Sequence, residues 1–90
     1  MKEGNSRAMN KESVRQFIVE TFLFGNGDWL EDDMSFLESG VVDSTGILEL
    51  IMFLEDTFGI TIADDELVPE NLDSISNIAN FLEDKLVEKV

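Results

Sequence analysis

The Asp43–Ser44 pair is where side chains of this sequence could take part in chemistry, because it opens the most hydrophobic helix-like segment of the chain. A helix N-terminus stabilises an attached phosphate through its free backbone N–H groups and its dipole. Ser44 has no activating base, since the sequence contains no His or Cys and no Lys stands near it. A serine in this position is suited to covalent modification rather than to catalysis. The alternative, from the residues alone, is that Ser44 only caps the helix.

The composition excludes several classes of protein. A chain of 90 residues forms one small domain. The absence of Cys excludes disulfides and thiol nucleophiles, and the absence of His removes most transition-metal sites and the usual neutral-pH base. With 20 acidic and 6 basic residues the formal charge is -14, which disfavours nucleic acid as a partner, while a hydrophobic fraction of 43% is too high for a disordered segment. We therefore expect a folded, acidic, non-catalytic domain.

The first half of the chain is expected to contain one helix and one long loop. Residues 1–10 are polar and are expected to form a flexible tail, which leaves residues 11–90 as the domain. Apolar residues at helical spacing predict a helix over about residues 11–24, ended by a Gly-Asn-Gly turn. The connection over residues 28–43 is long for a compact domain, and its scattered apolar side chains predict that it packs onto the core.

The second half is expected to contain two further helices and a short turn. A helix is predicted over about residues 44–58, with a core face formed by Ile47, Ile51, Leu54 and Phe58. A single turn is expected at residues 64–67 before Pro69 interrupts, and a last helix follows the capping pair Asp73–Ser74. These elements predict an all-α fold, a small antiparallel four-helix bundle with three main helices, one short third helix and a long first loop.

Two segments resemble the acyl carrier proteins. They are Phe36-Leu-Glu-Ser-Gly-Val-Val-Asp-Ser44 and Glu49-Leu-Ile-Met-Phe-Leu-Glu-Asp-Thr-Phe58, within a similarity that runs from about Val14 to Leu86. The resemblance implies that Ser44 carries a 4′-phosphopantetheine group, transferred from coenzyme A by a phosphopantetheinyl transferase, with Asp43 as the motif aspartate. It also implies that the protein is no enzyme, but carries acyl intermediates as thioesters and presents them to enzymes of a fatty-acid, polyketide or specialised lipid pathway.

The alternatives concern the cargo and the modification itself. Thr45 replaces the leucine usual in the family, Gly46 stands where the fatty-acid type often has an acid, and two residues separate Gly40 from Asp43. That last spacing is similar to D-alanyl carrier proteins and other stand-alone carriers. An aminoacyl, D-alanyl or peptidyl carrier loaded by an adenylating ligase is therefore one alternative. An unmodified acidic partner-binding helical domain is the second.

The second helix is expected to present a docking surface. At about 100° per residue, the side chains of Thr45, Glu49, Met52 and Asp56 form one stripe away from the core face, and Glu55 adds a carboxylate beside it. A Met among carboxylates suits the basic patches of a synthase, acyltransferase or ligase, and carriers of this family dock through this helix. Phe53 fits neither the core face nor plain solvent exposure.

No metal site, membrane insertion or nucleic-acid binding is expected. The carboxylates at residues 28–33 and 64–66 suggest calcium, but an EF-hand loop starting at Asp28 would have Leu30 at position three and Asp33 in place of the glycine. No stretch is long and apolar enough for a membrane span or an export signal. We expect a monomeric, cytoplasmic protein.

Overall fold

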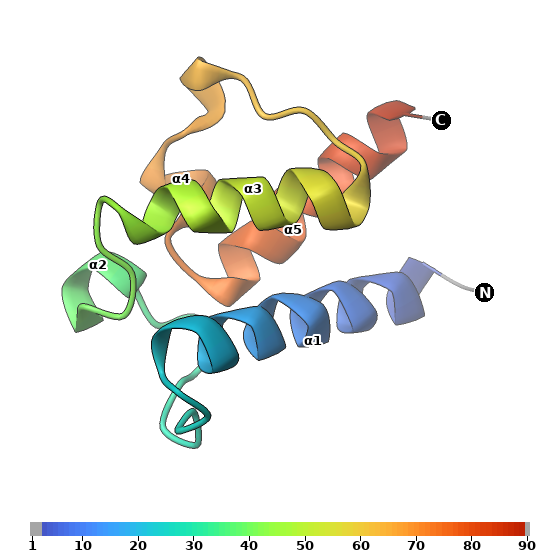
Figure 1. Ribbon diagram of the computed structural model, residues 1–90. Helices are drawn as coiled ribbons and strands as arrows, with labels where there is room; N and C mark the ends of the chain where they lie inside the picture. Colours follow the sequence, from blue (N-terminus) through green and yellow to red (C-terminus); the bar gives the residue numbers. More distant parts are fainter. Residues whose placement is uncertain (1–2, 90) are drawn as a thin grey trace.

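The computed structural model describes residues 3–89, and the side chains of residues 9–86. The helices are α1 (Glu3–Phe22), α2 (Phe36–Ser39), α3 (Gly46–Phe58), the 3₁₀ turn η1 (Asp64–Glu66), α4 (Pro69–Leu72) and α5 (Ile75–Lys89). Residues 3–89 contain no strand, so the expected all-α fold is confirmed. In Figure 1, α1 runs in the opposite direction to α3 and α5.

Helix α1 is longer at its N-terminus than the sequence predicts. It begins at Glu3 rather than near Lys11, so part of the expected tail is helical, while residues 1–2 lie outside the described residues. The helix ends at Phe22, where Phe24 and Gly25 adopt left-handed backbone angles. The Gly25 N–H donates to the Val19 carbonyl at 3.0 Å, which closes the last turn. The division of the chain into tail and domain stays a prediction.

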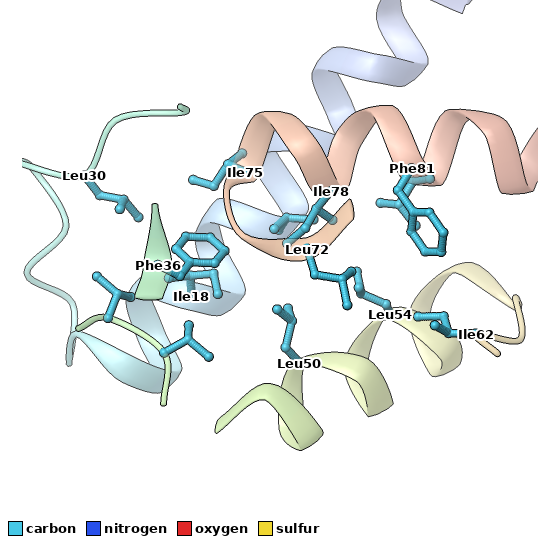
Figure 2. Close-up of a cluster of buried hydrophobic side chains, with 14 of the residues drawn as sticks. Ile18, Leu30, Phe36, Leu50, Leu54, Ile62, Leu72, Ile75, Ile78 and Phe81 are labelled. Atoms are coloured by element: carbon cyan, nitrogen blue, oxygen red, sulfur yellow. The ribbon is translucent and has the colours of Figure 1, made fainter. Parts of the chain in front are cut away.

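The core gathers buried side chains from every α-helix and from the loops between them. Figure 2 shows Leu50 and Leu54 of α3 pointing into a cluster with Ile18 of α1 and Ile78 of α5, and all four are fully buried. Each such burial contributes about 1.5–3 kcal/mol relative to exposure. The predicted core face of α3 is therefore rotated: Leu50 and Leu54 are central, whereas Ile47, Ile51 and Phe58 are only partly buried. Ile47 and Ile51 instead line a cleft described below.

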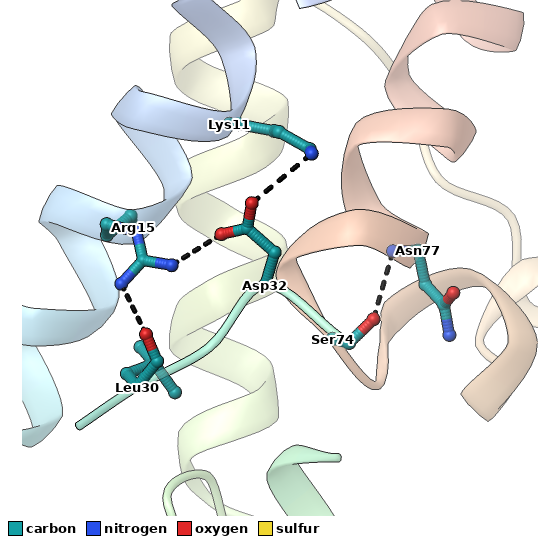
Figure 3. A network of polar contacts seen from close by, with 6 residues as sticks. All are labelled: Lys11, Arg15, Leu30, Asp32, Ser74 and Asn77. Carbon is teal, nitrogen blue, oxygen red and sulfur yellow. Dashed lines mark hydrogen bonds and ion pairs between the residues drawn. The ribbon is translucent and has the colours of Figure 1, made fainter. Parts of the chain in front are cut away.

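An ion-pair network fastens the first half of the long loop to two helices. Asp32 accepts hydrogen bonds from Arg15 and, at 3.3 Å, from Lys11, both on α1, and Arg15 also donates to the Leu30 carbonyl at 2.7 Å (Figure 3). The Ser76 N–H of α5 donates to the Asp32 carbonyl at 2.8 Å. The Arg15 guanidinium, followed by the Lys11 ammonium, lowers the pKa of the Asp32 carboxyl. The loop packs on the core as predicted, with Leu30 buried.

The second half of the loop contains α2, which the sequence did not predict, and Asp73 holds it in place. The Phe36 N–H donates to the Asp73 carbonyl at 2.7 Å. The Asp73 carboxylate accepts the Leu37 N–H at 3.0 Å and the Ser35 hydroxyl. Through these bonds α2 is joined to the α4–α5 junction. Ser74 caps α5 as predicted, since its hydroxyl accepts the Asn77 N–H at 3.0 Å.

The segment between α3 and α5 also differs in detail from the prediction. The turn expected at residues 64–67 is present as η1, and α4 is an additional turn that the sequence did not predict. Pro69 begins α4 because a first helical position needs no N–H donor. Glu66 of η1 accepts both the Ala63 N–H at 2.9 Å and the Lys85 ammonium of α5 at 3.0 Å, and both lower the pKa of its carboxyl. The Lys85–Glu66 ion pair thus attaches this segment to α5.

Candidate functional site

Ser44 lies in the turn just before α3, which begins at Gly46 rather than near residue 44 as predicted, and Asp43 caps the start of the helix. The Asp43 carboxylate accepts the Gly46 N–H at 2.7 Å, and the Asp43 carbonyl accepts the Ile47 N–H at 3.0 Å. Asp43 therefore caps the helix, which is the role that the sequence left open as the alternative for Ser44. The Ser44 side chain is exposed, and within the described part of the chain its hydroxyl has no hydrogen-bond partner. The hydroxyl is accessible to an enzyme that would modify it.

Close contact with α1 fixes the start of α3. A Cβ atom at Gly46 would lie 2.6 Å from Cε1 of Phe22, well inside ordinary van der Waals distance. Gly46 is buried, so the Phe22 ring presses directly against the backbone two residues after Ser44. The departure at Gly46 noted in the sequence thus has a packing reason: an acid at this position would collide with Phe22.

An apolar cleft of about 230 Å³ opens beside Ser44, between α2, α3 and α4. Ser44 and Asp43 stand among its lining residues, and the remaining lining is mostly aliphatic or aromatic, including Phe36, Val42, Ile47, Ile51, Val68 and Leu72. The cleft is also lined by three leucines that are largely exposed to solvent, with exposed fractions of 62% for Leu37, 60% for Leu48 and 40% for Leu67. Exposed leucines grouped at one cleft indicate a binding surface.

Only some of the residues that line this cleft could have been identified from the sequence. Leu48 stands four residues after Ser44 and so shares its side of the helix, which the spacing alone could have shown. Leu37 and Leu67 come from other elements and are brought to α3 by the tertiary fold. Asp73, which holds α2 in place, was predicted only as part of a helix cap.

The structure brings together three of the five predicted docking residues. Glu49, Met52 and Asp56 line a shallow groove between α3 and α1, whereas Thr45 is exposed nearer to Ser44. The Glu55 carboxylate instead accepts the Ile62 N–H at 2.9 Å and holds the chain that follows α3. Phe53 stacks on Phe17 of α1 with ring centroids 4.1 Å apart, which explains why it fits neither of the environments considered for it.

The site suits a phosphate ester bearing a long, partly apolar substituent. The Gly46 and Ile47 N–H groups already donate to Asp43, but the positive end of the α3 dipole still favours the negative charge of a phosphate on the Ser44 hydroxyl. The apolar cleft begins at the same residue. No group of three or more acidic side chains within the described residues could hold a metal ion, and no helix of that part is long and apolar enough to cross a membrane.

Comparisons with known proteins agree with this geometry. The chain is 37% identical over 75 residues to an acyl carrier protein of Petrotoga mobilis, covering 83% of this chain and 85% of the relative. It is 34% identical over 68 residues to a D-alanyl carrier protein of Streptococcus suis, covering 76% and 84%, respectively. The family described as "Phosphopantetheine attachment site" matches residues 14–82. The chain therefore belongs to the family of carrier proteins that hold a phosphopantetheine group and do not themselves catalyse reactions.

Proposed function

We propose that Ser44 is the residue to which phosphopantetheine is attached, and that the protein presents acyl cargo on this group to biosynthetic enzymes. When bound, the group supplies the terminal thiol that this cysteine-free chain lacks, on which cargo is carried as a thioester. The observation that carries the proposal is the exposed Ser44 hydroxyl in the turn before α3, which has no hydrogen-bond partner among the described residues, with Asp43 as the cap. Because Asp43 satisfies the helix end, modification of Ser44 removes no hydrogen bond from the fold.

The cleft beside Ser44 supports an acyl cargo. Its volume of about 230 Å³ and its apolar lining suit part of a hydrocarbon chain, and each buried methylene contributes about 0.8 kcal/mol. An aminoacyl group would bring an ammonium ion, whose desolvation in an apolar cleft is unfavourable unless it is paired. We therefore favour a lipid-related pathway, with the protein acting as a cytoplasmic monomer.

A D-alanyl or other aminoacyl carrier is the second candidate. Two observations favour it: the two-residue spacing between Gly40 and Asp43, and the similarity to a protein named as a D-alanyl carrier. In this alternative an adenylating ligase loads the cargo, and the attachment residue stays the same. The two candidates differ in whether the cleft contributes to cargo binding.

Docking through α3 is also part of the proposal. Carrier proteins act with phosphopantetheinyl transferases and with synthases or ligases. The carboxylates of Glu49 and Asp56 are exposed on either side of Met52, which is 64% exposed. A basic patch on such an enzyme would pair with these charges and bring Ser44 toward its active site.

The attachment residue is tested by intact mass measurement after incubation with coenzyme A and a broad-specificity phosphopantetheinyl transferase. The wild-type protein is expected to gain one phosphopantetheine group, and Ser44→Ala none. Ser39→Ala is the matched control, because Ser39 is an exposed serine of the neighbouring α2 and should leave modification unchanged. Full modification of Ser44→Ala would contradict the assignment.

The cargo is tested by comparing thermal unfolding of proteins loaded from octanoyl, acetyl and D-alanyl thioesters of coenzyme A. An octanoyl chain that enters the cleft should raise the midpoint above that of the acetyl form, because it buries apolar surface only in the folded state. The D-alanyl form should match the acetyl form. Equal midpoints for all three would remove the argument for an acyl cargo over an aminoacyl one.

A further inference from the structure

A second hollow lies on a different face of α3 from the cleft. This α1–α3 groove is shallow, has a volume of about 440 Å³, and is lined by Phe17 and Thr21 of α1 and by Glu49, Met52, Phe53, Asp56 and Thr57 of α3. Two helices thus contribute to one surface, whereas the predicted docking stripe was confined to a single helix. The groove places α1 residues next to the proposed docking residues.

Two stacked aromatic rings, Phe17 and Phe53, form the floor of the groove, and two further rings pack against them. Phe17 and Phe53 stack with their planes 11° apart. Phe22 packs edge-on against Phe17 at 5.9 Å between centroids, and Phe58 packs edge-on against Phe53 at 6.3 Å. Rings that hold each other in this way offer a preformed apolar surface, so a partner side chain would not have to order it on binding.

The charges around the groove determine what can occupy it. Glu49 and Asp56 are exposed and stand on either side of Met52, and the sequence has no Lys or Arg between Gln16 and Asp84. A second copy of this chain would bring the same carboxylates and be repelled, as would a nucleic acid or an anionic lipid surface. An apolar side chain flanked by Lys or Arg is complementary to both the floor and the rim.

We propose that the α1–α3 groove receives an apolar side chain flanked by basic residues on the phosphopantetheinyl transferase, so that Thr21 and Phe17 of α1 take part in recognition together with α3. The inference rests on the proposed function of Ser44. Glu49 lies in the first turn of α3, only five residues after Ser44. An enzyme can therefore contact the groove while its active site reaches the Ser44 hydroxyl.

The test fills the groove without altering any charge of α3. Thr21→Trp places a large side chain in the groove, and Gln16→Trp adds the same side chain at an exposed position of α1 that does not line it. The rate of phosphopantetheine transfer is measured by intact mass against protein concentration, with circular dichroism to verify the fold. Thr21→Trp is expected to lower kcat/KM about tenfold or more, mainly through KM, with Gln16→Trp close to wild type.

A second variant keeps the test decisive if Thr21→Trp does not fold. Thr21→Lys adds a positive charge at the same position and should also lower kcat/KM, because it repels basic residues, with a larger loss at low salt than at high salt. Wild-type rates for the folded Thr21 variants would contradict the proposal that the transferase binds in the α1–α3 groove. Failure of the wild-type protein to be modified would instead contradict the proposed function of Ser44, so the two failures are distinguishable.

Discussion

Replacing Gly46 by Ala should destabilise the protein, although the same change stabilises most helices. A Cβ at this position would lie 2.6 Å from the Phe22 ring, so the ring or the start of α3 must shift by roughly 0.8 Å to restore ordinary contact. Overpacking of this kind costs about 1–3 kcal/mol. Removing a glycine from a helix contributes at most about 1 kcal/mol in the other direction. We therefore expect a net loss of about 1 kcal/mol.

The assay is thermal unfolding followed by circular dichroism, combined with a double-mutant cycle. A loss of about 1 kcal/mol lowers the midpoint by about 4–8 °C in a domain of this size. Phe22→Leu removes the ring atoms that the new Cβ would meet, and in that background Gly46→Ala should be neutral or stabilising. The coupling energy between the two positions is then about 1–2 kcal/mol. A higher midpoint for Gly46→Ala in the wild-type background would refute the close contact.

Two further predictions concern the loop after α1. Phe24 is 91% exposed and has a φ of 55°, which is an unfavourable backbone angle for a bulky side chain. Phe24→Gly should therefore raise the free energy of unfolding by about 1 kcal/mol. An unchanged or lower urea midpoint would contradict this prediction. Because Arg15 and Lys11 lower the pKa of Asp32 in the folded state, its ion pairs stabilise the protein above the ordinary value of 3.8 and lose this effect as the pH falls through the lowered pKa. Asp32→Asn should therefore lower the free energy of unfolding by less than about 1 kcal/mol at pH 7, since water screens the half-exposed ion pair. The urea midpoints of wild type and variant should converge at acidic pH. A difference between these midpoints that stays constant from pH 7 to pH 3 would exclude a role for the charge.

The sequence was sufficient for features that depend on local spacing. The end of the second helix at Phe58, the cap at Ser74 and the family resemblance around Ser44 all follow from residues close together in the chain. The core face of α3 was less accurate, because periodicity locates the apolar side of a helix but does not show that Ile51 borders a cleft while Leu50 enters the core.

Features that depend on residues far apart in the chain could not be predicted. Helix α2 is a single turn, too short for a periodic pattern, and its position depends on a bond between Ser35 and Asp73 across 38 residues. The α1–α3 groove depends on Phe17 meeting Phe53, and nothing local to either residue indicates this pairing. In both cases the tertiary contact, and not the local sequence, determines the surface that a partner would meet.

The bonds between Asp73 and α2 have a mechanical consequence for the cleft. Because its carbonyl and both carboxylate oxygens bind Ser35, Phe36 and Leu37, α2 and the end of α4 should move as one body. Lys85 restrains the chain just before α4 by binding Glu66. A longer cargo would therefore widen the cleft by moving α3 away from α2 and α4, rather than by separating α2 from α4. Strain from an oversized chain would then reach α3, which begins two residues after Ser44, so the length of the cargo could be sensed by an enzyme docked on α3.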